Sequence, residues 1–344
     1  MSDMDLKIKK TFKGLRPNYI DNNKLICSDI YDIYIIYLDT LNKQKVGKIN
    51  TIKRIFSKSR LASRLLRMGI SIIKKFNRYY VIYSDHGLYV SNEDFSVLNQ
   101  IEEVPNRSYQ LLDHNICATE KNIYFSEYFS NKNREDVEIW KSSDAAKWDK
   151  VYTFPKESIR HVHSIQKDPY ENKLWICTGD RNKETMIAKT DYEFNNFKII
   201  GKNKQEFRTL ELIFESNSIY WGTDCPYEKN KIMRYKRESE EVKEISNDEF
   251  KGPISNLKKV NKNKYLACTW DEGGPEGGGK KTQILTSKNL HDWTCLKSYD
   301  KDIYPYLMGY GRVILPIGVG SEIIFYGQGL KGIDNQLLIG ELYF

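Results

Sequence analysis

Short apolar segments that end in a small or polar residue followed by an acid recur along the chain. They read KLICSD, YVIYSD, IYFSE, LWICTGD, IYWGTD and YLACTWD, and they end at Asp29, Asp85, Glu127, Asp180, Asp224 and Asp271. A seventh segment, IIFYGQ, ends at Gln328 in place of the acid, and the spacing between segments is about 50 residues. Their length and their content of β-branched and aromatic residues predict buried strands.

Each of these segments stands between other segments of strand length. MGISIIKKF precedes YVIYSD, for example, and VEIWKS and DKVYTF follow IYFSE. Each unit of about 50 residues therefore predicts four antiparallel strands. Four-stranded sheets repeated at this period are typical of a β-propeller.

We therefore predict an all-β fold, a single β-propeller domain over 1–344 with seven four-stranded blades. The amino-terminal strand at 5–12 is expected to supply the outer strand of the last blade, because this closes the ring and removes an exposed edge. Six blades is the alternative, if 15–50 does not form a complete blade. The blades are expected at roughly 13–50, 66–105, 107–155, 158–201, 206–246, 252–299 and 306–344.

Composition agrees with a folded, strand-rich protein. Of the 344 residues, 13% are aromatic and 29% are charged, which argues against a disordered chain. No apolar run reaches the length of a bilayer span, and the amino terminus lacks the apolar region of a secretory signal. We therefore expect no membrane span and a cytoplasmic location. Cys27, Cys177 and Cys268 occupy the same place in three strands, which favours buried free thiols over disulfides.

The net charge of +8 raises the question of a polyanionic partner. The lysines are scattered and no nucleic-acid-binding motif is present, so we expect no nucleic-acid partner. The basic stretch at 53–67, KRIFSKSRLASRLLR, is expected to be a solvated helix or loop between two strand groups, with a lipid- or nucleic-acid-binding patch as the alternative. The sequence leaves the oligomeric state open.

A second repeated pattern occupies the turn before the fourth strand of a unit. It reads SSDAAKW at 142–148 and SKNLHDW at 287–293, where the Ser and Asp or Asn side chains can bond to the turn backbone while the Trp enters the core. This pattern resembles the Asp-box (BNR) repeat of sialidase-like propellers, S-x-D-x-G-x-x-W, although it is one residue shorter and lacks the glycine. In that family the boxes lie on the face away from the active site, so we assign none of them to chemistry.

Antiparallel connectivity predicts where chemistry gathers. In a hairpin formed by the first two strands of a unit, the start of the first strand and the end of the second lie at the same end of the sheet. Arginines and acids stand at these positions, so we expect them around one mouth of the central channel, where propellers and other scaffolds place ligands. Caps and charge pairs without further function are the alternative. The candidates are Arg160, His161 and His163 with Asp180, Arg67 with Asp85, Arg208 with Asp224, and Arg16 and Arg312.

His161 and His163 are expected to project to one face of their strand, because residues i and i+2 do so. Such a pair can supply a general base and acid near neutral pH. No cofactor is expected, but a divalent metal at His161 and His163, with His114 as a third ligand, is an alternative. Trp221 and Trp270 can stack on sugar rings or belong to the core. The loop at 271–282 is expected to lie over the channel mouth, with Glu276 able to reach a ligand.

The resemblance to sialidase-like propellers implies an exo-glycosidase in which three arginines hold a substrate carboxylate, a Tyr–Glu pair attacks and an Asp acts as the acid. Arg16, in Leu-Arg-Pro, is similar to the family's first arginine motif; Arg208 and Arg312, the latter close to Tyr310, are candidates for the other two.

We therefore expect a carbohydrate-active propeller that binds and processes an acidic glycan. Hydrolysis would use two carboxylates such as Asp180 and Asp224, whereas β-elimination from a uronate would use His161 or His163 as the base. The alternative is a non-catalytic propeller that presents this face to a protein or glycan partner.

Overall fold

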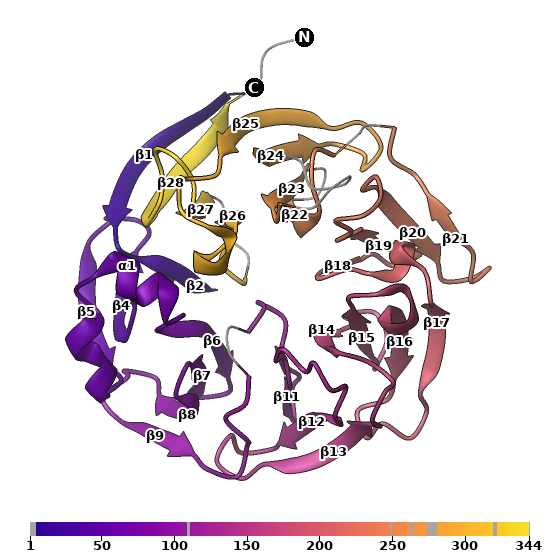
Figure 1. Ribbon diagram of the computed structural model, residues 1–344, viewed down its shortest axis with the longest axis horizontal. Coiled ribbons are helices and arrows are strands. Elements are labelled where there is room, and N and C mark those ends of the chain that lie inside the picture. The colour runs from indigo at the N-terminus through magenta and orange to yellow at the C-terminus, as the bar shows by residue number, and fades with distance from the viewer. Residues whose placement is uncertain are drawn as a thin grey trace.

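The strands of this protein form small antiparallel sheets arranged like the blades of a fan around a central opening (Figure 1). The computed structural model describes residues 5–108, 111–247, 250–261, 264–273, 281–318 and 322–343. The predicted all-β propeller is confirmed.

Five separate sheets contain four strands each, paired in chain order. The first two sheets contain β2 (Arg16–Asp21), β3 (Lys24–Asp29), β4 (Asp32–Tyr37) and β5 (Lys43–Lys48), then β6 (Ile70–Phe76), β7 (Tyr79–Ser84), β8 (Gly87–Asn92) and β9 (Leu98–Ile101). The next three contain β10 (Ile116–Ala118), β11 (Ile123–Ser126), β12 (Val137–Ser142) and β13 (Asp149–Phe154), then β14 (His161–Lys167), β15 (Leu174–Gly179), β16 (Met186–Thr190) and β17 (Lys198–Lys202), then β18 (Leu212–Phe214), β19 (Ser218–Gly222), β20 (Ile232–Lys236) and β21 (Val242–Glu244).

The remaining strands belong to one eight-stranded sheet that joins two such units. β23 bridges the units because Trp270 pairs with Arg312 of β26. The predicted number of seven blades counts this sheet as two, and that number stays a prediction. The units are β22 (Ile254–Asn261), β23 (Lys264–Asp271), β24 (Lys281–Ser287) and β25 (Thr294–Asp300), and β26 (Gly311–Ile314), β27 (Ile323–Gln328) and β28 (Gln336–Tyr343) with β1 (Asp5–Lys13).

The two ends of the chain close the ring. β1 pairs antiparallel with β28, with Lys13 opposite Gln336 and a register shift between Ile8 and Lys10. In Figure 1 the indigo amino-terminal strand lies beside the yellow carboxy-terminal strand. The predicted closure by the amino-terminal strand is therefore confirmed.

The second strand of a unit is buried on both faces because neighbouring sheets pack against it from either side. In β15 all six residues are buried, whereas the outer strand β5 has no buried residue. The cysteines are free, and five of them are buried while Cys295 is exposed. The sequence pattern of continuous apolar strands thus reflects the stacking of sheets around the ring.

The turns that resemble Asp boxes have the predicted chemistry. The Asp144 carboxylate accepts hydrogen bonds from the backbone amides of Ala146 and Lys147, and Trp148 is buried with its indole N–H donating to the Ala145 carbonyl at 2.9 Å. Each such turn fastens the outer hairpin of a unit to the core.

The basic stretch at 53–67 is helical, as predicted, but it is not wholly solvated, because Ser63 and Arg64 are buried. It forms η1 (Ile52–Phe56) and α1 (Arg60–Leu65), with the Thr51 and Ser59 side chains accepting hydrogen bonds at their amino-terminal ends. The other helices are single 3-10 turns: η2 (Asn182–Glu184), η3 (Gln205–Phe207) and η4 (Tyr306–Met308), the last in contact with α1. Within the described ranges, no helix has the length and apolar character to cross a membrane.

Removing residues 1–13 tests the closure. Without β1, β28 becomes an unpaired edge and Leu6 leaves its buried site, so we expect the melting temperature to fall by at least about 5 °C and aggregation to increase. Differential scanning calorimetry and light scattering measure both. Removing only residues 1–4, which precede β1, is the control; equal melting temperatures for the two truncated proteins would contradict the role of β1.

Candidate functional site

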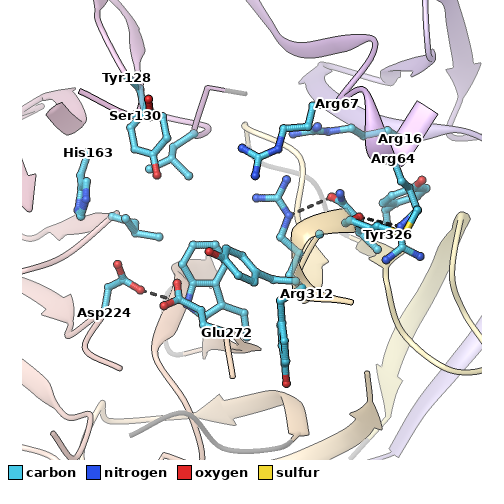
Figure 2. A pocket seen from close by; sticks show the side chains of 18 of the residues that line it. Arg16, Arg64, Arg67, Tyr128, Ser130, His163, Asp224, Glu272, Arg312 and Tyr326 are labelled. Carbon is cyan, nitrogen blue, oxygen red and sulfur yellow. Dashed lines mark hydrogen bonds between the residues drawn. The ribbon is translucent and has the colours of Figure 1, made fainter. Parts of the chain in front are cut away.

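A cavity of about 520 Å³ opens at the centre of the ring. Figure 2 shows Arg16, Arg67 and Arg312 on one side of it, with Tyr128, His163, Asp224 and Glu272 toward the other. Most of the residues predicted from the sequence line this cavity: Arg16, Arg67, Arg160, His163, Asp180, Arg208, Asp224, Trp270 and Arg312.

Strand register brings these residues together. Arg16 at the start of β2 pairs with Ser28 near the end of β3, and His161 at the start of β14 pairs with Gly179 at the end of β15. Each unit therefore presents the start of its first strand and the end of its second strand at the same edge, as antiparallel pairing requires.

Asp180 is the most heavily contacted carboxylate of the cavity. Its Oδ2 lies 2.6 Å from Nη1 of Arg160, and its Oδ1 lies 3.5 Å from Nη2 of Arg208. Nε2 of His163 and Nε2 of His161 lie 3.1 and 3.4 Å from the same Oδ1. Burial alone raises the pKa of Asp180, but its contacts with the two imidazoles outweigh this and lower it, so the group is ionised at neutral pH.

Both imidazoles are buried and held by backbone carbonyls. Nδ1 of His161 lies 2.9 Å from the Phe129 carbonyl oxygen, and Nδ1 of His163 lies 3.3 Å from that of Thr209. A carbonyl only accepts hydrogen bonds, so Nδ1 of His161 carries a hydrogen. His163 lies between two acceptors, because its Nε2 is 3.1 Å from Oδ1 of Asp180 and can donate to that carboxylate. Burial lowers the pKa of His163 to about 4, which keeps this ring neutral at pH 7.

His161 and His163 lie close together, as their spacing predicted, although the strand is irregular between them. β14 shifts register between Val162 and Ser164, and the two rings lie 5.2 Å apart between centroids. His161 stacks on Tyr128 and does not line the cavity, whereas His163 does. His161, predicted as a catalytic group, is therefore placed behind His163. His114, the suggested third metal ligand, instead lies 3.0 Å from Glu211.

Asp224 and Glu272 form a second acidic group. Asp224 is buried, with Oδ2 3.2 Å from Nε of Arg208 and Oδ1 3.1 Å from the indole nitrogen of Trp270. Burial first, and then the negative charge of Asp180, raise the pKa of Asp224 to about 7. Burial and the charge of Asp224 raise the pKa of Glu272 to about 8. At neutral pH the two carboxyl groups together therefore keep at least about one proton.

The arginine side of the cavity has few carboxylates. The carboxylate closest to Arg16 is that of Asp113, at 3.9 Å, and Nε of Arg16 is buried without a partner among the described residues. Nε of Arg312 donates to Oε1 of Gln328 at 2.9 Å, and burial together with the charge of Arg16 lowers the pKa of Arg312 to about 10. Gln328 stands where the repeat predicts an acid, so Arg312 lacks the counter-ion that Arg208 has in Asp224.

Arg67 does not pair with Asp85, which corrects the prediction. Asp85 instead accepts hydrogen bonds from Lys53 Nζ at 2.8 Å and from the Tyr31 hydroxyl at 3.0 Å. η1 carries Lys53 to Asp85, and the left-handed backbone of Arg67 (φ 48°) ends α1 with its side chain at the cavity. No ion pair of Arg67 occurs among the residues that the structure describes.

The two tryptophans have different places. Trp270 lines the cavity, as predicted. Trp221 does not: it is fully buried in a core cluster and its indole N–H donates to the Glu206 carbonyl at 2.7 Å. The prediction that Trp221 binds substrate is therefore wrong, and its alternative as a core residue holds. Glu276 lies outside the described residues.

Sequence reasoning missed several lining residues, and three of them show why. Glu272 follows Asp271, the acid that the repeat predicts at the cavity. The Asp271 carboxylate instead accepts a hydrogen bond from the Tyr306 hydroxyl at 2.9 Å. Tyr128 follows the acid Glu127 in the same way. Arg64 comes from α1, outside the repeat, and bonds to Asp302 and to the Met308 carbonyl. In two of the three cases the useful residue follows the repeat's acid directly.

No protein-family model matches this sequence, and no curated protein matches it significantly. Among solved structures, the chain is similar to an oligogalacturonate lyase in complex with manganese, with a TM-score of 0.65, 9% identity, and 99% of this chain and 98% of that one covered. It is also similar to YCF48 bound to a D1 peptide, with a TM-score of 0.58, 8% identity, and 99% and 96% covered. A chain of the mitotic checkpoint complex gives a TM-score of 0.63, 8% identity, and 100% and 94% covered.

These likenesses define the class of protein. At identities this low they show the fold, and together with the strand arrangement they make this chain a β-propeller protein.

The raised pKa of Glu272 predicts a pH-dependent effect of Glu272→Gln. The unfolded chain loses this proton near its ordinary pKa while the folded chain keeps it, so the group reduces stability increasingly as pH rises from about 4.5 to about 8. Glu272→Gln should therefore raise the melting temperature more at pH 8 than at pH 5. The exposed Glu238→Gln is the control. An equal difference from wild type at both pH values, measured by calorimetry, would contradict the raised pKa.

Proposed function

We propose that this propeller binds an acidic carbohydrate in its central cavity and cleaves it by β-elimination beside a uronate carboxylate. One observation carries the proposal: Arg16, Arg67 and Arg312, whose only ion pair among the described residues is that of Arg16 with Asp113 at 3.9 Å, face carboxyl groups that retain a proton at neutral pH across one cavity.

The arginine side suits a substrate carboxylate. Arg16 and Arg312 are half-buried and Arg67 is exposed at the cavity, so their donors can reach a ligand, and a planar carboxylate matches guanidinium donors bidentately. A bound carboxylate would relieve the repulsion between Arg16 and Arg312 that lowers the pKa of Arg312. The sugar carbon next to the bound carboxylate would also lose its proton more easily, because the positive charge of the arginines stabilises the enolate-like intermediate.

The acidic side suits proton transfer. Of Asp224 and Glu272, the ionised member accepts the proton from the carbon next to the carboxylate, and the protonated member donates to the departing glycosidic oxygen. The C–H and C–O bonds break, a C=C bond forms, and no water is consumed. We assign proton transfer to this pair in place of the predicted His161 or His163, because His161 does not line the cavity and His163, with a pKa of about 4, is a weak base.

The fold of the oligogalacturonate lyase supports the choice of a uronate as the first substrate to test. It does so as a likeness of fold at 9% identity, and the chemistry rests on the residues of the cavity.

Incubation with galacturonate oligomers tests the elimination. We expect an ultraviolet-absorbing unsaturated uronate product from the wild-type protein, and a loss of kcat/KM of at least about 100-fold in Arg312→Gln. The exposed Arg78→Gln is the matched control and should retain activity. Absence of product with all uronate oligomers, or full activity in Arg312→Gln, would refute the proposal.

Asp224→Asn separates proton transfer from binding. We expect kcat to fall at least about 100-fold while KM changes little, because Asp224 is assigned to the chemical step, whereas Arg312→Gln should raise KM as well as lower kcat, because Arg312 is assigned both to binding and to stabilising the intermediate. The exposed Asp39→Asn serves as control. Steady-state kinetics that show the same change in kcat and KM for the two variants would refute this division of roles.

Glycoside hydrolysis of the sialidase type is a second candidate. Glu272, whose raised pKa keeps it protonated at neutral pH and whose charge acts on Tyr310, favours it, because hydrolysis needs a carboxylic acid that is protonated at neutral pH. New reducing ends or free sialic acid without ultraviolet absorbance would identify it. Silence in both assays with retained glycan binding would identify the non-catalytic alternative.

A further inference from the structure

Three side chains beside the cavity converge on one point. Nε2 of His161, Nε2 of His163 and a carboxylate oxygen of Asp180 all lie within 4.8 Å of one another. Both histidines come from β14, and Asp180 directly follows β15. His161 and His163 are 3% and 1% exposed, so water does not solvate their ring nitrogens freely.

The hydrogen bond of His161 leaves its converging nitrogen without a hydrogen. Nδ1 of His161 is engaged with the Phe129 carbonyl, which assigns the hydrogen to Nδ1 and the lone pair to Nε2. His163 lies between the Thr209 carbonyl and the Asp180 carboxylate, so a cation bound to its Nε2 would leave its hydrogen on Nδ1 for the carbonyl. A carbonyl on the far ring nitrogen is also the usual outer support of a histidine that binds a metal.

Nε2 of His161 is the independent sign that something is missing. It is buried and has no hydrogen-bond partner among the described residues. A single proton shared between His163 and Asp180, 3.1 Å apart, would still leave His161 unsatisfied. A cation at the point of convergence would use all three donors.

A cation at this point would also change the ionisation of the neighbouring acids. Asp180, Asp224 and Glu272 are three carboxyl groups, and the guanidinium groups of Arg160 and Arg208 contact only the first two. Glu272 has no ion-pair partner in the described part of the chain. Added positive charge beside Asp180 would let the acidic wall ionise at lower free-energy cost.

We propose that His161, His163 and Asp180 bind one divalent first-row transition metal ion, such as Mn²⁺ or Zn²⁺. Two imidazole nitrogens and one carboxylate oxygen suit these ions better than Ca²⁺ or Mg²⁺, which prefer oxygen ligands. Three protein ligands leave coordination positions open. Because His163 and Asp180 line the cavity, these positions face the space where a ligand oxygen would enter.

Gly179 gives the His163 ring the space that it occupies in this cluster. A Cβ atom at Gly179 would lie 2.3 Å from Cε1 of His163, so a larger residue would push the ring out of the cluster. The glycine before Asp180 therefore keeps His163 in place.

Metal titration of the full-length protein after chelator treatment tests the proposal. We expect calorimetry with MnCl2, and electron paramagnetic resonance of the free Mn²⁺, to report one ion bound per chain in the absence of any carbohydrate. His161→Asn is the informative variant, because the asparagine amide can keep the hydrogen bond to the Phe129 carbonyl while Nε2 is lost. We expect its affinity to fall at least about 100-fold, with unchanged circular dichroism and melting temperature in the metal-free state.

The exposed His291→Asn is the matched control and should bind as wild type does. Should the cluster variant fail to fold, anomalous diffraction from wild-type crystals soaked in Mn²⁺ decides the matter by the position of the ion. No binding to wild type, binding that His161→Asn retains, or an ion located away from these three residues would overturn the proposal. These outcomes do not depend on a substrate, so they are distinguishable from failure of the proposed lyase activity.

Discussion

The pairing of β1 with β28 is the constraint on which this structure depends. It joins the two ends of the chain, completes the last unit, and fixes the ring in which every other unit stands. Its consequence reaches the cavity directly: Arg16 begins the unit that follows β1, and Arg312 begins the unit that β1 completes. Residues near opposite ends of the sequence thereby become the two arginines whose charges interact most directly in the cavity.

The cavity has a positively charged side and an acidic side, and keeping them apart lowers the free energy of unfolding. On one side, Arg16 and Arg312 are half-buried, and their one ion pair is that of Arg16 with Asp113 at 3.9 Å. On the other side, burial and neighbouring negative charge raise the pKa values of Asp224 and Glu272. A protein selected for stability alone would place the two groups in contact. Natural sequences depart from such local optima mainly at functional sites, which is the physical reason for placing binding and proton transfer here.

The repeat in the sequence predicted the strands, the closure and most of the cavity, because period and antiparallel pairing are local consequences of residue order. The repeat did not predict the placement of side chains that depends on residues distant in sequence but packed nearby. Trp221 and Trp270 both stand in the second strand of a unit, three residues and one residue before its acid, and both are buried, yet only Trp270 lines the cavity. Glu272 was missed because the pattern selects Asp271, and the separation of Arg67 from Asp85 depends on η1, an insertion outside the repeat. Spacing identifies an edge of a sheet, whereas the direction of a side chain at that edge is set by its packing.

The most direct test of this account is a crystal structure of the protein with a bound uronate oligomer. The account predicts that one sugar carboxylate lies within hydrogen-bond distance of Arg312 and of Arg16 or Arg67, with the adjacent glycosidic oxygen toward Asp224 and Glu272. A carboxylate bound elsewhere on the ring, with these arginines contacting only protein or solvent, would contradict it.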